Sequence, residues 1–249
     1  MSAGYWAARG AFSVSSVFAD PDTTAVVEPV RQVGRWFERV HLAALQTTPG
    51  VELLASNVPL RDGGHTLGEL DAVFRVDGAV VHREVAVKYY LAAKPGDDPA
   101  CWVGPGKRDR LDLKLDRLAT HQLSLPTRAR EAGVWPQTLP FPQRSEVLLL
   151  GAVFSPEHDV RLPRGASSGA EHGRWYSASE FAARFETQPW CVLDKPWWLS
   201  PEHARSQTFA PARAIAETLD RPLLVAAVEP ALVRAFVVPD GWWADLTER

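Results

Sequence analysis

The stretch that decides the fold is TLGELDAVFRVDGAVVHREVAVKYYL, residues 66–91. Two runs that alternate apolar and polar residues flank Asp77-Gly78, a dipeptide typical of the two-residue type I′ turn of a β-hairpin. With that turn, residues whose numbers sum to 155 lie opposite each other, so Phe74 faces Val81. The sequence therefore predicts a hairpin with a defined register.

The alternation gives this hairpin two chemically different faces, because successive strand side chains point to opposite sides. The face expected to join the core is apolar except for Arg83, and carries Ala72, Phe74, Val76, Ala79, Val81, Val85 and Val87. The opposite face concentrates charge, and carries Glu69, Asp71, Val73, Arg75, Val80, His82, Glu84, Ala86 and Lys88.

Asp71 and Glu84 are expected directly opposite each other on the charged face, with Cα atoms about 4.5 Å apart. Like charges so placed destabilise a hairpin, and two such carboxylates do not both ionise cheaply unless a cation joins them. Mg²⁺ suits them, because it binds hard oxygen ligands and keeps waters and substrate phosphates in its shell. Since Lys88 on the same face could hold a phosphate or a nucleophilic water, the pattern predicts a metal-dependent phosphodiesterase.

The order of these motifs resembles the PD-(D/E)XK nuclease superfamily: a helix with a glutamate (GRWFERVHLAAL), then GELD, a turn, and a strand with an acid and a lysine. More closely, the succession of motifs across roughly residues 30–200 is similar to the bacterial domain-of-unknown-function 1853 family, namely GRWFE, LGELD, EVAVKYYL, GPGKRDRLDLKLDRLATHQL and KPWWLSP. The resemblance implies an α/β fold with a restriction-endonuclease-like core, in which helices flank a central mixed β-sheet. It also implies Mg²⁺ or Mn²⁺ as cofactor and DNA or RNA as substrate.

One departure from the superfamily concerns the second acid, which normally stands two residues before the lysine, where this chain has Ala86. The acid here is Glu84, about 13 Å from Lys88 along a flat strand. The hairpin register keeps Glu84 opposite Asp71 but moves Lys88 away, unless a bulge or strand twist brings it back. The spacing leaves open whether the site is catalytic.

Three groups of candidate residues follow from the hairpin and the resemblance. The expected catalytic residues are Asp71, Glu84 and Lys88; the metal ligands are Asp71, Glu84, Glu69 and Glu38; the substrate-binding residues are Lys114, Gln122 and His82. The resemblance alone suggests roles for Glu38, Lys114 and Gln122, which otherwise read as solvated helix residues. Glu69 reads equally well as part of an exposed strand edge, and His82 as a packing residue.

Net charge, cysteine content and hydropathy limit the classes of protein to which this chain can belong. With a net charge of −3, any nucleic-acid surface must be local rather than global. Cys101 and Cys191 have no CxxC partner, which favours a reduced cytosolic chain. No apolar run approaches the roughly 18 residues of a membrane span, and the N-terminus lacks a signal-peptide pattern. We therefore expect a cytoplasmic protein with no membrane contact.

The expected organisation is an irregular N-terminal segment (1–26), a nuclease-like α/β core (27–155) and a C-terminal α/β extension packed on the same domain (156–249). Periodicity predicts helices at 27–47, 108–123, 178–186 and about 210–219, strands at 51–60, 146–154, 173–177, 222–229 and 235–239, and loops at 92–107 and 124–145.

Two functional hypotheses from different classes remain open. The first is a Mg²⁺-dependent nuclease that acts on DNA or RNA. The second is a catalytically inactive nuclease-fold protein that serves as a binding or assembly module. A glycosidase that uses the same carboxylate pair is weaker, because Lys88 has no role in it. The chain has no Walker loop, HExxH or GxSxG motif.

Overall fold

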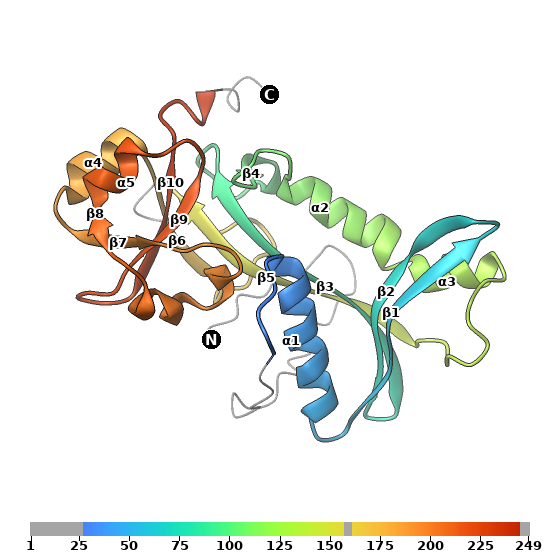
Figure 1. The fold of residues 1–249 in the computed structure, drawn as a ribbon. Helices are drawn as coiled ribbons and strands as arrows, with labels where there is room; N and C mark the ends of the chain where they lie inside the picture. The colour runs from blue at the N-terminus through green and yellow to red at the C-terminus, as the bar shows by residue number, and fades with distance from the viewer. Residues whose placement is uncertain (1–26, 157–160, 245–249) are drawn as a thin grey trace.

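The fold is α/β, with one large mixed sheet flanked by helices (Figure 1). The computed structural model describes residues 27–156 and 161–244, so the expectation for 1–26 lies outside it. Within the described residues ten strands form the sheet, nine of them in the order β1 (Val51–Asp62), β2 (His65–Val76), β3 (Ala79–Ala92), β5 (Arg144–Ser155), β6 (Glu171–Ser177), β10 (Val233–Val238), β9 (Leu223–Ala227), β7 (Pro189–Val192) and β8 (Ala210–Pro211). β4 (Trp102–Val103) pairs with β3 off this path.

The predicted hairpin and its register are confirmed. β2 and β3 pair from Val76↔Ala79 to Ala72↔Arg83, with Phe74 opposite Val81. Asp77 and Gly78 have φ values of 50° and 76°, the left-handed conformation that a type I′ turn requires at both central residues. The ladder ends one pair before the expected Asp71–Glu84 pair, because β2 continues along β1 while β3 continues along β5.

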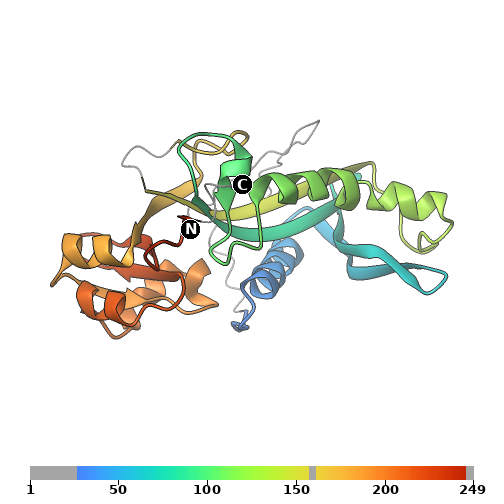
Figure 2. The ribbon, with the colours of Figure 1, turned by 90° about the horizontal axis from the view of Figure 1, so that it is seen from above.

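Helices cover both faces of β3 and β5, as Figure 2 shows from above. α1 (Val33–Thr47) packs Leu45 against Phe74 and Val81 on one face. α2 (Leu111–Arg117) and the π-helical segment η2 (Leu118–Gln122) cover the opposite face. Since β5 lies between two helical layers, its nearly continuous apolar sequence is explained.

The C-terminal strands extend the same sheet through the parallel pairing of β5 with β6. α4 (Ala178–Phe185) and α5 (Ala212–Glu217) cover one side of these strands. On the other side lie the 3₁₀ segments η3 (Trp197–Leu199) and η4 (Pro201–Ser206). The largest core cluster joins Tyr89 and Leu91 of β3 to Trp198 and Phe236, so both halves of the chain share one core.

Three expectations need correction. The segment 124–145, expected as a loop, contains α3 (Leu125–Glu131), because Pro126 lies in the first turn, where a missing N–H removes no helical hydrogen bond. The loop 92–107 contains η1 (Pro99–Cys101) and β4. The first helix begins at Val33 rather than 27. No helix among residues 27–156 and 161–244 is long and apolar enough to cross a membrane.

Candidate functional site

Asp71 lies where β2 separates from β3. Beyond this point its carboxylate, rather than a backbone carbonyl of β2, accepts a hydrogen bond from the β3 backbone. Its Oδ2 accepts a hydrogen bond from the backbone N of Val85 at 2.8 Å. Burial and the negative charges of Glu84, Glu38 and Glu69, opposed by the Val85 hydrogen bond, together raise the pKa of Asp71 to about 7. The structure therefore places the other three predicted acidic ligands within electrostatic reach of Asp71.

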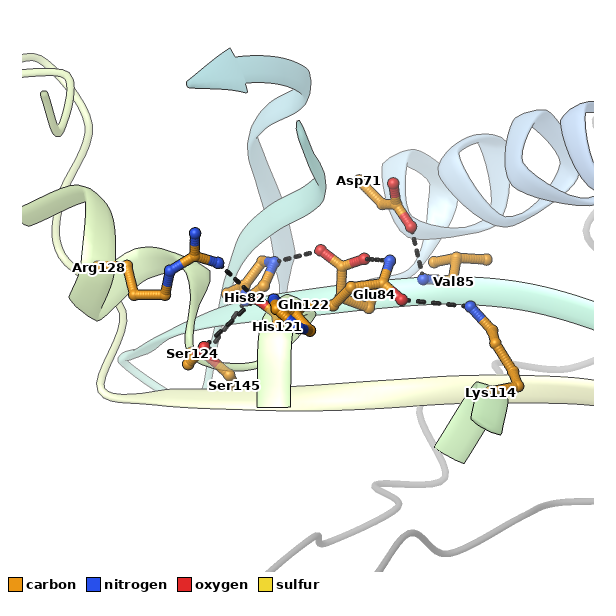
Figure 3. A network of polar contacts seen from close by, with 10 residues as sticks. All are labelled: Asp71, His82, Glu84, Val85, Lys114, His121, Gln122, Ser124, Arg128 and Ser145. Carbon is orange, nitrogen blue, oxygen red and sulfur yellow. Dashed lines mark hydrogen bonds and ion pairs between the residues drawn. The ribbon is translucent and has the colours of Figure 1, made fainter. Parts of the chain in front are cut away.

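Glu84 is buried, and hydrogen bonds fix both oxygens of its carboxylate (Figure 3). Oε1 lies 2.9 Å from Nε2 of His82, and Oε2 accepts from Nε2 of Gln122 at 2.6 Å. The other ring nitrogen of His82 lies 3.1 Å from the hydroxyl of Ser145 on β5. Two predicted substrate-binding residues thus touch the predicted catalytic acid and hold its orientation.

The π-helical turn explains why Gln122 reaches Glu84. The N–H of Leu123 donates to the carbonyl of Leu118 at 2.9 Å, an i→i+5 bond that inserts one extra residue into the turn. In a regular α-helix residues eight apart point about 80° away from each other, and one inserted residue nearly removes this offset. Lys114 and Gln122 therefore share a side, and Nζ of Lys114 donates to Oε1 of Gln122 at 3.2 Å.

Lys114 is half-buried and lies among charges of both signs. Burial and the positive charge of Lys88 lower the pKa of Lys114, while Glu84, Asp109 and Asp71 act to raise it. The chain Lys114–Gln122–Glu84 makes Lys114 the lysine most directly linked to the acid pair.

Lys88 is placed differently from the expectation that it accompanies the acid pair. It forms an ion pair with Asp109, which lies just before α2 and also accepts from the hydroxyl of Tyr90 at 3.4 Å. Opposite Lys88 on β5 stands Gly151, whose φ is 143° and where a Cβ would lie 1.6 Å from the Lys88 carbonyl oxygen. The backbones of β3 and β5 approach closely here, which only glycine permits.

The remaining predicted ligands lie on the periphery of the site. Glu69 is exposed within β2, where it pairs with Pro59 of β1, and Glu38 is half-buried on α1. Among the residues that the structure describes, no group of three or more His, Cys, Asp or Glu side chains is arranged so that it could hold a metal ion. The carboxylates of Asp71 and Glu84 contact the backbone N of Val85 and the side chains of His82 and Gln122.

Sequence reasoning missed two residues of this network, Ser145 and Asp109. Ser145 meets His82 because β5 runs parallel to β3 with these residues as register partners. A parallel register between distant segments has no short-range sequence signal, unlike the turn of a hairpin. Asp109 stands in a segment, GKRDR, that is otherwise basic. The composition of this segment therefore gave no indication that its one carboxylate pairs with Lys88.

Comparison with known proteins places the chain in one family. No curated protein and no solved structure matches it. Residues 19–249 match the family described as "Domain of unknown function (DUF1853)", which covers the hairpin, the π-helical turn and the C-terminal strands. The chain belongs to the DUF1853 family.

Proposed function

We propose that this protein is a Mg²⁺- or Mn²⁺-dependent nuclease, with a restriction-endonuclease-like core formed by α1, β1–β3 and β5. The observation that carries the proposal is the convergence of Asp71 and Glu84, two carboxylates from separating strands, beside Lys114. Paired acids with a neighbouring amine are the side chains that metal-dependent phosphodiester cleavage uses.

The donor set fits one divalent ion. Mg²⁺ is usually bound by one or two carboxylates together with waters and substrate phosphates, so Asp71 and Glu84 suffice. Each carboxylate oxygen has two acceptor sites, and the hydrogen bonds to Val85, His82 and Gln122 leave free lone pairs. When bound, the ion would stabilise charge on the phosphate and lower the pKa of an attacking water.

The protein's own residues then have distinct roles. His82 and Gln122 hold Glu84 in one orientation, so the acid pair is preorganised. Lys114 supplies positive charge to a phosphate oxygen beside the pair, and its lowered pKa reflects burial and the nearby positive charge of Lys88, both of which a bound phosphate would offset. Lys88 would contact a neighbouring phosphate of DNA or RNA.

A second candidate is a nuclease-fold protein without catalysis, which serves as a binding or assembly module. The engagement of both Glu84 oxygens by protein donors, and of Lys88 by Asp109, favours it. In that account the polar network stabilises the fold and no ion enters.

A cleavage assay separates the two candidates. Single- and double-stranded DNA and RNA are incubated with the protein in Mg²⁺, in Mn²⁺ and in chelator, with Asp71→Asn, Lys114→Met and, as control, Asp116→Asn on the exposed side of α2. A nuclease cleaves only with metal and loses about 100-fold or more of its rate in the first two variants, with the control unchanged. Absence of cleavage on all substrates, or equal rates in Asp71→Asn and wild type, would reject the nuclease in favour of the non-catalytic protein.

A further inference from the structure

A cavity of about 600 Å³ lies in the C-terminal half, where β6 and β10 begin, and shares no residue with the network around Asp71. Residues of β6 and β10, of α4 and of the segment before β10 line it. A volume of this order suits a small organic ligand. Since nothing in the nuclease proposal uses it, the cavity calls for its own explanation.

Two arginines in the cavity share one aromatic ring. The guanidinium of Arg174 lies 4.9 Å from the ring centroid of Tyr176, and that of Arg184 lies 6.0 Å from the same centroid and 5.8 Å from that of Phe185. Rings thus lie beside both guanidinium groups, and the third arginine, Arg234, forms an ion pair with Glu171. Arg174 and Arg184 are therefore positioned to receive an anion.

Buried donors without acceptors point the same way. Within the described residues, Nε of Arg174 and Nε1 of Trp190 are buried with no hydrogen-bond partner, and both residues line this cavity. Arg174 does use another nitrogen, since Nη2 donates to the carbonyl of Pro156 at 2.6 Å and lies 3.9 Å from Glu180. Buried donors nearly always find an acceptor, so two buried donors without partners, on two residues that line one cavity, favour an acceptor that enters from outside.

The rest of the lining is mainly apolar, and includes Phe154, Ala227, Pro230, Leu232, Val233 and Ala235. Val233, which begins β10, is 50% exposed. Two acids, Glu171 and Glu229, also line the cavity. Glu171 pairs with Arg234, whereas Glu229 forms no ion pair with an arginine among the described residues. The combination fits a ligand with an apolar body and one anionic group.

We propose that this cavity binds a small amphiphilic anion whose carboxylate or phosphate lies against Arg174 and Arg184 and whose apolar part fills the space toward Leu232. Arginine suits this role, because its planar fork of donors matches both oxyanions. Binding at this cavity is independent of the nuclease function and is tested separately.

Calorimetric titration of the full chain tests it with four probes: phenyl phosphate, 3-phenylpropionate, the neutral 3-phenylpropanol and inorganic phosphate. We expect one or both aromatic anions to bind, and to bind about tenfold or more tightly than the alcohol or inorganic phosphate. Preference between phenyl phosphate and 3-phenylpropionate identifies which anionic group the natural ligand carries.

Variants connect binding to the cavity. Arg184→Met, at an exposed position, and Arg174→Met should each lower the binding affinity for the aromatic anion by about tenfold or more. Arg213→Met should not, because Arg213 lies outside the cavity and pairs with Glu217 on α5. Thermal unfolding confirms that each variant is folded. Failure of both aromatic anions to bind at millimolar concentration, equal affinity for the alcohol, or unchanged affinity in Arg184→Met would overturn the proposal.

Discussion

Among single residues, Asp71 couples charge to stability most directly. Burial and the neighbouring acids raise its pKa from 3.8 to about 7, so the folded state binds a proton more tightly than the unfolded chain. The stability that this proton contributes is complete below about pH 4 and is lost as the pH rises through about 7.

Asp71→Asn should therefore leave stability near pH 4 almost unchanged and increase it near pH 8, in the absence of metal, by about 1–2 kcal/mol. The asparagine oxygen can still accept from the backbone N of Val85, so the hydrogen bond is retained. Urea unfolding at both pH values measures the difference, with Asp116→Asn as control. A difference that does not change with pH would show that the pKa of Asp71 is not raised in the folded state.

Arg83, the one charge on the core face of the hairpin, is neutralised within the core. Its Nε donates to Oε1 of Glu146 on β5 at 2.6 Å, and both side chains are 3% exposed. His41 of α1 lies beside Arg83, and burial followed by the arginine charge lowers the pKa of His41 to about 3, so this imidazole is neutral.

Glu146→Ala should cost about 3–5 kcal/mol of unfolding free energy, because it leaves a buried guanidinium without its carboxylate. The matched control is Glu52→Ala, which breaks the exposed ion pair of Glu52 with Arg75 across β1 and β2 and should cost less than about 1 kcal/mol. Denaturant unfolding compares them. Similar losses in the two variants would mean that the core pair is as well solvated as the surface pair.

At the scale of elements, the junction of β3 and β5 depends on Gly151. Gly151→Ala should destabilise the protein by at least about 2 kcal/mol, because its Cβ would lie 1.6 Å from the Lys88 carbonyl oxygen and its φ of 143° is strained for alanine. Gly34→Ala on α1, where a Cβ meets nothing within 4 Å, should instead stabilise by about 1 kcal/mol. Thermal unfolding distinguishes the two variants. If Gly151→Ala leaves the stability unchanged, the backbones of β3 and β5 do not approach closely at this residue.

The sequence predicted elements best where local chemistry decides the structure. Asp77-Gly78 determined the turn and hence the register down to Ala72↔Arg83. Three candidate site residues, Glu84, His82 and Gln122, lie in contact with one another through hydrogen bonds to Glu84. The π-helical turn could not be predicted, because the periodicity of residues 108–123 is that of an ordinary helix. The position of Lys88 depends on a parallel register and on Asp109, which are non-local features.

The whole molecule is organised around one continuous sheet. β6 pairs with β5, and the largest core cluster packs Tyr89 and Leu91 against Trp198 and Phe236 from the C-terminal half. Removal of residues 156–249 would expose this cluster to water, at roughly 25 cal/mol for each Å² of apolar surface.

A chain truncated after Ser155 should therefore lack a unique fold, while the full chain should unfold in a single transition. Two-dimensional ¹H–¹⁵N NMR spectra of both chains test this, with dispersed resonances expected for the full chain alone. Dispersed resonances from the truncated chain would show that residues 27–155 fold on their own, contrary to the shared core.

The proposed nuclease function requires that Asp71 and Glu84 together hold a divalent cation. Calorimetric titration of Mn²⁺ into the wild type, Asp71→Asn and Asp116→Asn tests it most directly, because it needs no knowledge of the substrate. We expect one bound ion in the wild type and in Asp116→Asn, with release of a proton from Asp71 near pH 7, and no binding in Asp71→Asn. Absence of binding to the wild type at millimolar Mn²⁺, or equal binding in Asp71→Asn, would rule out this metal site and leave the acid network as a structural feature of the fold.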